Sequence, residues 1–338
     1  MAVQTDTNIV SIDALISAFF TFAVANSGFT DEGTVPITLD TISQTLRRIS
    51  RITNAVTTYW GFVERPMTST FADTIKIESR MMRVLPTAAN WTTLADGQRI
   101  RTQLGLYNFA APYTGYKFYS DGNNVFAAVE VRVGIYTHFG IGNIDKCGTY
   151  DGGEFLQGDF HEFSAGFFQP IQISTTITHF LFAPQTNDSS TSGNYIRFNA
   201  GGNDELDFYK LGREDNSSNV SGSATISPPS TTGSTGTGSV TSTTARFDPF
   251  GRVIDNSPST ATLVAPIMPC YITRVDSTLV KQRIIGQVPN IGGISIGNLN
   301  AKDIVNTDWD VYPRCQKTGD NTVATISDDW GIAYKAIP

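Results

Sequence analysis

The residues best suited to bind a metal ion lie in the middle of the chain. The three histidines are His138, His161 and His179, and Cys147 follows the first of them. Imidazole, thiolate and carboxylate groups are the usual ligands of zinc. Only Asp159 and His161 have the close spacing on one strand that such sites use, so we expect no metal and no cofactor. The acidic residues weighed as partners are Asp145, Asp151, Glu154, Asp159 and Glu162. We interpret His138 as a packed aromatic side chain and His161 as a surface or interface residue.

Three of these carboxylates could also hydrolyse a glycosidic bond, a reaction that needs two acids flanking the sugar. The candidate acids are Glu154, Asp159 and Glu162. The aromatic residues that would stack on the sugar are Tyr150, Phe155 and Phe160. Acids can be paired on paper in this way in almost any β protein, so we expect that the chain is not an enzyme.

Motifs for calcium and phosphate are incomplete. Residues 202–207, GNDELD, resemble part of a calcium loop but lack the full ligand set, so a solvated acidic turn is the better interpretation. The patterns HExxH, GxGxxG and GxxxxGK[ST] are absent. Residues 286–297 are rich in glycine but contain no lysine to hold a phosphate, which favours close packing of strands.

The charge of the chain argues against nucleic acid as its main partner. The formal net charge is −7 and the pI is about 5.0, whereas phosphate contacts require clustered Lys and Arg. The nearest basic groups are Arg47, Arg48 and Arg51, followed by Arg80 and Arg83. They lack interleaved aromatic residues, so we interpret them as a solvated or interface surface.

Cysteine usage and hydropathy indicate a chain that folds in a reducing compartment. Cys147, Cys270 and Cys315 are widely spaced and form no CxxC pair, so we expect three free thiols. No signal peptide is expected, because no basic region precedes the first apolar stretch. That stretch, residues 14–25, is too short to span a bilayer, so we expect no membrane segment.

One amphipathic helix is predicted near the start of the chain. Ser11 is a suitable N-cap, and the apolar residues after it recur with helical spacing as far as Gly28. The stripe consists of Ile12, Leu15, Ile16, Phe19, Phe22 and Ala23. Phe20 lies beside it, which predicts burial on more than one side, against the core or a partner subunit.

Beyond Gly28 the pattern changes to strands. Short β-branched or aromatic runs at residues 34–39, 55–63 and 74–78 are separated by Pro, Gly, Asn and Asp. Residues 116–119 and 125–133 flank Asp121-Gly122, which predicts a hairpin. Alternation in the second strand predicts that the face from Val125 to Val133 is buried. The other face, with Phe126, Glu130 and Arg132, is predicted to be partly exposed to solvent. Further strands are predicted at 262–267, 271–275 and 328–334.

Residues 216–244 are nearly all Ser, Thr and Gly, a composition that cannot bury enough apolar surface to offset chain entropy. We therefore divide the chain into an N-terminal helix and strand region (1–110), a central β domain (111–215), a linker or extended arm (216–245) and a C-terminal β region (246–338). With a charged fraction of 16% and 21 Phe and 12 Tyr, the predicted class is mainly β with few helices (α+β). The expected core is an antiparallel sandwich or barrel-like sheet after the N-terminal helix.

Three stretches resemble a family of tailed-bacteriophage virion proteins. The predicted helix and its exit, residues 12–16 and 21–30 (IDALI and TFAVANSGFT), are similar to the opening of such chains, with Phe29 where Trp is usual. Residues 134–155, GIYTHFGIGNIDKCGTYDGGEF, together with Tyr116-Lys117-Phe118-Tyr119, are similar to a central block in which Cys147 replaces an aromatic residue. Residues 330–335, WGIAYK, resemble the short Gly-aromatic endings of these proteins.

This resemblance, which covers about a third of the chain, implies a non-catalytic structural component of the neck, tail or baseplate. The implied partners are copies of the chain and other virion proteins, and the implied location is the virion after synthesis in the host cytoplasm. The alternative is a glycan-binding or receptor-binding module of a tail fibre or tailspike, which would need an exposed aromatic platform. The resemblance brings no catalytic, cofactor or metal residue with it.

Overall fold

The computed structural model describes residues 1–39, 41–65, 76–91, 99–105, 111–149, 152–158, 162–164, 167–169, 194–198, 208–212, 223–227, 267–276, 281–296, 299–313 and 330–336. This part of the chain is mainly β, with a single helix and sheets that are almost entirely antiparallel, as predicted. The exception is a parallel pair, β16 with β17.

The helix is α1, Ile12–Asn26. The strands are β1 Ala2–Ile9, β2 Thr30–Leu39, β3 Ile42–Thr53, β4 Val56–Arg65, β5 Lys76–Met82, β6 Arg99–Gly105, β7 Tyr113–Ser120, β8 Val125–Arg132, β9 Ile135–Asn143, β10 Asp145–Lys146, β11 Gly152–Gly158, β12 Glu162–Ser164, β13 Phe167–Gln169, β14 Asn194–Phe198, β15 Phe208–Gly212, β16 Ser223–Ser227, β17 Met268–Asp276, β18 Lys281–Ser295, β19 Ile304–Val305, β20 Trp309–Pro313 and β21 Trp330–Lys335.

Helix α1 begins and ends where its sequence predicts. The Ser11 hydroxyl accepts a hydrogen bond from the Ala14 N–H at 3.1 Å, which satisfies one free donor of the first turn. Gly28 follows the helix with a φ of +64°, a conformation that suits glycine. One element was not predicted: strand β1 precedes the helix and pairs with β7 along its whole length.

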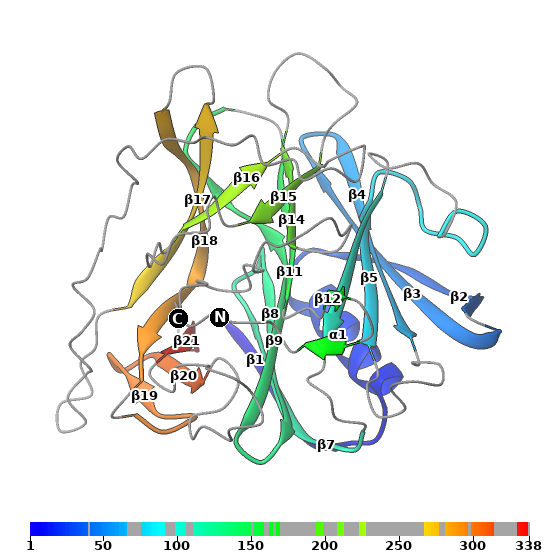
Figure 1. Cartoon of the computed structure of the whole chain (residues 1–338), viewed down its shortest axis with the longest axis horizontal. Coiled ribbons are helices and arrows are strands. Elements are labelled where there is room, and N and C mark those ends of the chain that lie inside the picture. Colours follow the sequence, from blue (N-terminus) through cyan, green and yellow to red (C-terminus); the bar gives the residue numbers. More distant parts are fainter. Residues whose placement is uncertain are drawn as a thin grey trace.

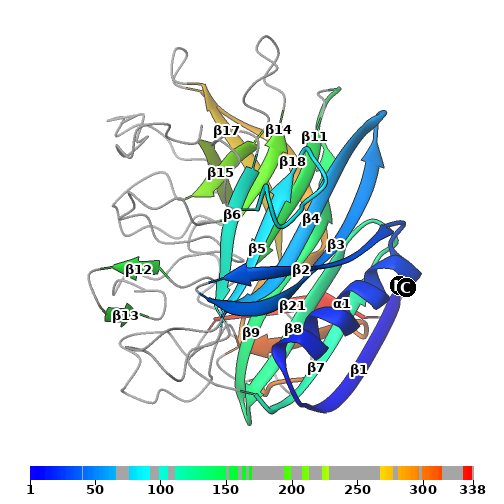
Figure 2. The same cartoon turned by 90° about the vertical axis from the view of Figure 1, so that its right-hand side faces the viewer.

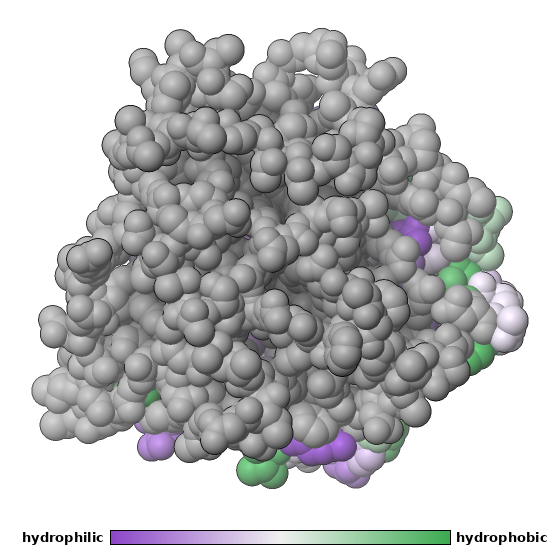
Figure 3. All heavy atoms as spheres, in the orientation of Figure 1, coloured by the Kyte–Doolittle hydropathy of each residue, from purple (hydrophilic) through white to green (hydrophobic). Residues whose placement is uncertain are grey.

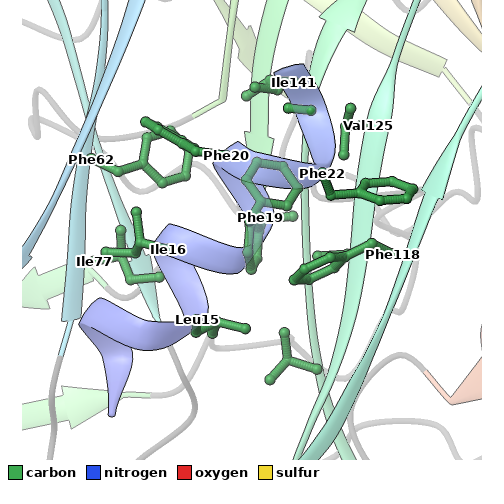
Figure 4. Close-up of a cluster of buried hydrophobic side chains, with 14 of the residues drawn as sticks. Leu15, Ile16, Phe19, Phe20, Phe22, Phe62, Ile77, Phe118, Val125 and Ile141 are labelled. Carbon is green, nitrogen blue, oxygen red and sulfur yellow. The ribbon is translucent and has the colours of Figure 1, made fainter. Parts of the chain in front are cut away.

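Two sheets enclose the main core. A five-stranded sheet has the order β2-β3-β4-β5-β6, and a 14-stranded sheet runs from β1 and β7 through β18 to β21, β20 and β19 (Figures 1 and 2). Figure 4 shows α1 between them, with Phe62 and Ile77 on one side and Phe118 and Val125 on the other. Phe20 is 6% exposed and packs on Phe62, so the core, not a partner, explains its burial.

The predicted hairpin is formed by β7 and β8, joined by a turn in which Gly122 has a φ of +90°. Val125 and the alternate residues that follow it are buried toward α1, except Val133, which is 84% exposed. The opposite face is drier than predicted: Phe126 is 2% and Glu130 is 8% exposed, and only Arg132 at the end of β8 is exposed as expected. A second layer, formed by β20 and β21, covers this face, and the sequence pattern gave no sign of it.

Part of the Ser/Thr/Gly-rich segment is described. Its residues 223–227 form β16, which pairs with β15 and β17 of the same chain. The rest of residues 216–244 lies outside the described part, as do the strand expected at 262–266 and Cys315. The domain boundaries at 110, 215 and 245 stay predictions.

Candidate functional site

The possible ligands named from the sequence do not form a metal site in the part of the chain that the structure describes. His138 is buried in β9 and Glu154 in β11, whereas Asp145 in β10 and Cys147 beyond it are exposed. Among the described residues no three His, Cys, Asp or Glu side chains are placed to hold an ion. Outside the described residues lie Tyr150, Asp151, Asp159, Phe160, His161, His179 and residues 202–207, and the side chain of Glu162 is not described.

Phe155 is fully buried, so it is not the sugar-stacking residue that the sequence suggested. Its ring packs on Phe126 with the centroids 6.1 Å apart, and its carbonyl oxygen accepts a hydrogen bond from Trp60 Nε1 at 3.1 Å. The bond joins the main sheet to the five-stranded sheet, which makes Phe155 a core residue.

His138 lies at a buried junction between β9 and the C-terminal strands. Its Nε2 is 2.9 Å from the carbonyl oxygen of Pro313, and its Nδ1 is 2.8 Å from the hydroxyl of Tyr334. A carbonyl oxygen only accepts, so Nε2 carries the proton; in the neutral ring, Nδ1 then accepts from the hydroxyl. The prediction of a packed aromatic role for His138 is confirmed, with two hydrogen bonds added.

A second set of polar contacts joins β7 to β20 at the same junction. The Tyr119 hydroxyl donates to Asp310 Oδ2 at 2.8 Å and lies 2.8 Å from the Tyr312 hydroxyl. Lys117 forms an ion pair with the same carboxylate. Burial raises the pKa of Tyr119 and Tyr312 well above the ordinary value for a phenol. Both hydroxyls therefore stay protonated, and Tyr119 stacks on Tyr334 with centroids 4.7 Å apart.

Glu130 completes this junction at the end of β8. Its carboxylate accepts from the Gly134 N–H at 3.0 Å, the Tyr136 hydroxyl at 3.1 Å and Lys302 Nζ at 2.9 Å. Burial opposes ionisation, but these donors outweigh it and lower the pKa of Glu130. Lys302 precedes β19, so the contact ties the C-terminal strands to the β8–β9 turn.

The polar groups of this junction hold two layers of strands together. Its histidine, tyrosine and carboxylate groups bond one another across two layers of strands, and satisfied networks of this kind specify one packing arrangement. Sequence reasoning missed Tyr119, Asp310, Tyr312 and Tyr334. The available signal was the presence of Tyr119 and Tyr334 in two predicted strands, since a buried hydroxyl needs a partner.

Residues 293–297, GISIG, have the GxSxG spacing of a serine nucleophile elbow. That elbow requires a sharp turn from a strand into a helix. Ser295 instead ends β18 and pairs with Trp330 of β21, and no helix follows within residues 299–313. The serine therefore belongs to a ladder between antiparallel strands, and the glycines allow close packing: a Cβ on Gly286 would lie 2.6 Å from the Asp145 carbonyl oxygen.

The arginines weighed as a basic surface contact other parts of the same chain. Arg47 forms two hydrogen bonds with Asp13 in α1, at 3.1 and 2.8 Å. Arg48 donates to the carbonyl oxygens of Glu32, Gly33 and Pro86. Arg51 donates to Asn123, and Arg80 to Glu78. The contacts of Arg47, Arg48 and Arg51 join elements of the fold, whereas Arg80 and Glu78 lie on the same strand, β5, and Arg83 is exposed.

The outer side of the N-terminal segment has an unusual composition for a solvent-facing surface. We call this surface, β1 with the exposed side of α1, the N-terminal face. The exposed or partly exposed residues of α1 are Asp13, Ala14, Ser17, Ala18, Thr21, Val24, Ala25 and Asn26. Their only charged member is Asp13, which is ion-paired with Arg47. Val10, 70% exposed, extends the face at the link between β1 and the helix, whereas Val3 lies opposite Tyr119 and so on the other side of β1.

No protein-family model matches this chain, and no curated protein sequence matches it.

Two further observations describe the surface and its surroundings. No helix among the described residues has the length and hydropathy required to cross a bilayer. On the side seen in Figure 3, the described residues lie at the lower and right-hand margins, where apolar and hydrophilic side chains alternate. The low charge on the outer side of α1 makes the N-terminal face the candidate contact surface among the described elements.

Proposed function

We propose that this chain is a non-catalytic structural subunit of a tailed-bacteriophage virion, located in the neck, tail or baseplate. It assembles with copies of itself and with other virion proteins after synthesis in the host cytoplasm. The resemblance of residues 21–30, 134–155 and 330–335 to such proteins supports the proposal, and the N-terminal face is the structural observation that carries it.

The composition of the N-terminal face suits contact between proteins. A helix that lies on a solvated surface normally carries Lys and Glu on its outer side. The outer side of α1 instead consists of small or uncharged residues, apart from the paired Asp13. The cores of protein interfaces are likewise depleted in charge, because a charge without a partner is costly to desolvate.

The hydrogen bonds and ion pairs of the polar residues within the subunit also support a structural role. His138, Asp310 and Glu130 bond partners on neighbouring strands and hold the C-terminal strands on the hairpin. Arg47 and Arg51 join the five-stranded sheet to α1 and to the β7–β8 turn. Nucleic acid is not proposed as the main partner, because these arginines are engaged within the subunit.

The alternative from the sequence, a glycan-binding or receptor-binding module, would present aromatic rings to solvent. Among the described residues, the exposed large apolar side chains are all valine or isoleucine. The aromatic residues proposed to stack on a sugar include Phe155, which is buried. The structural subunit is therefore the better supported proposal.

Quantitative mass spectrometry of purified particles tests the proposal. Virions are purified through successive density gradients, and the ratio of this chain to the major capsid protein is measured after each step. A subunit of the particle keeps a constant ratio, whereas a contaminant falls at every step. Absence from the particles, or a ratio that declines toward zero, would rule out the proposed function.

A further inference from the structure

The edges of the described sheets differ in their protection against pairing with another strand. Proteins usually protect an edge with a bulge, Pro, charged residues or a short strand. Strand β2 contains Pro36 and an irregularity between Asp31 and Thr34, and β6 contains Arg99 and Arg101. At the far end of the main sheet, β19 has only two residues.

Strand β1 has only one of these protections, the charged residue Asp6. It is eight residues long and pairs with β7 in one register, from Ala2 opposite Ser120 to Ile9 opposite Tyr113, with the ladder interrupted at Asn8, whose φ is +59°. It lies at the edge of the sheet and contains no Pro, Lys or Arg. Every second residue of an edge strand turns its N–H and C=O away from its neighbour, so β1 offers a row of backbone groups to a further strand.

We propose that β1 pairs antiparallel with β1 of a second copy of this chain, about a two-fold axis that places Thr5 opposite Thr5. This inference rests on the proposed function as a self-assembling subunit. The second copy is the chosen occupant because the other long edges of the described chain are guarded. The least protected edge that a second copy offers to β1 is therefore its own β1. Pairing β1 with β1 gives a closed, self-complementary contact.

Charge excludes one neighbouring register of this pairing. Partners across a sheet share one face, so odd residues meet odd residues and even residues meet even residues. A shift by two residues, centred on position 6, would put Asp6 opposite Asp6, and like charges directly opposite each other are destabilising. In the proposed register Asp6 lies opposite Gln4, whose amide can donate to the carboxylate.

The same register places favourable pairs on the other face of β1. Val3 lies opposite Thr7 of the copy, and the two Thr5 side chains meet at the axis. All three side chains are exposed in the single subunit. Pairs of β-branched residues and of threonines stabilise antiparallel strands, so assembly covers side chains that have no partner in the subunit.

Disulfide trapping tests the register in the full-length chain. Thr5→Cys is introduced with Cys147→Ser and Cys315→Ser, and the protein is oxidised with copper phenanthroline. Thr7→Cys in the same background is the matched control. Thr7 is also an exposed residue of β1, but in the proposed register it lies opposite Val3 of the copy. We expect a covalent dimer from Thr5→Cys, formed about tenfold faster than from Thr7→Cys. Equal rates, or no dimer from Thr5→Cys, would overturn the register.

A charge variant tests the contact without a crosslink. Thr5 lies opposite Lys117 within the subunit, so Thr5→Glu places unlike charges together there but like charges together across the two-fold axis. We expect sedimentation to show a dimer dissociation constant raised at least about tenfold by Thr5→Glu and little changed by Thr5→Gln. A monomeric parent chain, or equal effects of the two variants, would overturn the pairing.

The outcomes for the two proposals are separate. If purified particles contain the chain but Thr5→Cys fails to crosslink both in isolated protein and in those particles, the virion role is retained and the β1 contact is ruled out. If Thr5→Cys forms a crosslinked dimer but the chain is absent from particles, the β1 contact is retained and the virion role is ruled out.

Discussion

The hydroxyl of Tyr334, in the last strand, donates a hydrogen bond to Nδ1 of His138 at 2.8 Å, although 196 positions separate the two residues. Both side chains are fully buried. The bond fastens β21 to β9, and the stacking of Tyr334 on Tyr119 fastens it to β7 as well. The C-terminal strands are therefore held by this bond together with the other polar contacts of the junction, among them Tyr119 with Asp310.

Removing this donor should destabilise the fold. Tyr334→Phe keeps the ring but leaves Nδ1 of His138 without this donor, and a buried acceptor without its partner costs about 1–3 kcal/mol. The free energy of unfolding, measured by urea denaturation, should fall by this amount. Tyr59→Phe, on a partly buried tyrosine outside the junction, is the control and should change it by less than about 0.5 kcal/mol. An equal effect of the two changes would contradict the role of the bond.

The stability contributed by Glu130 should depend on pH. The folded-state pKa of Glu130 is lowered, so its contribution is complete above the ordinary value of 4.5 and is lost as the pH falls through the lowered value. We expect Glu130→Gln to cost about 1–3 kcal/mol at pH 7 and progressively less below pH 4.5. Chemical denaturation of both proteins across this range checks it. Asp308→Asn, at a looser ion pair of 3.7 Å with Lys335, should cost less at pH 7.

Gly61 leaves room for Trp91 on the outer side of the five-stranded sheet. A Cβ at position 61 would lie 2.6 Å from Cζ3 of Trp91, a ring that also packs 4.6 Å from the guanidinium of Arg80. Gly61→Ala should therefore displace the ring and cost about 1–3 kcal/mol, with a change in tryptophan fluorescence. The same change in a Trp91→Leu background should cost less. Additive effects of the two substitutions would contradict the steric explanation.

The β3–β4 turn contains an alanine in a left-handed conformation. Asn54 and Ala55 have φ angles of +50° and +63°, and the second suits glycine better than alanine. Ala55→Gly should raise the free energy of unfolding by about 0.5–1 kcal/mol, as measured by thermal or urea denaturation. Ala25→Gly, the same change in α1, should lower it by a similar amount. Destabilisation by both changes would contradict the assigned turn geometry.

The thiols should differ sharply in reactivity. Cys147 is exposed, whereas Cys270 is buried and burial raises the pKa of its thiol. In a Cys315→Ser background, an aromatic disulfide reagent should label one thiol quickly in the folded protein and both after unfolding. Labelling of the unmodified chain under denaturing, non-reducing conditions should count three thiols. A count of one would mean that two cysteines are bridged.

Local features were predictable because their causes lie within a few residues. Ser11 caps α1 through a side-chain contact three residues away, and Gly28 ends it with a positive φ. The β7–β8 hairpin follows from Asp121-Gly122 between two strands of alternating pattern. Close packing at Gly286 was likewise indicated by the glycine-rich run around it.

The sequence alone therefore determined the β-rich class, the limits of α1 and the position of one hairpin, since short-range sterics and periodicity fix these. The tertiary structure decided which distant strands became neighbours. Alternation shows that His138 and Glu130 share one face of a strand pair, but it does not identify the layer that covers them. The pairing of β1 with β7, the Lys117–Asp310 ion pair and the Tyr334–His138 bond depend on sheet order. That order is set by the packing of the whole chain, because each strand could pair with many others before the core selects one arrangement.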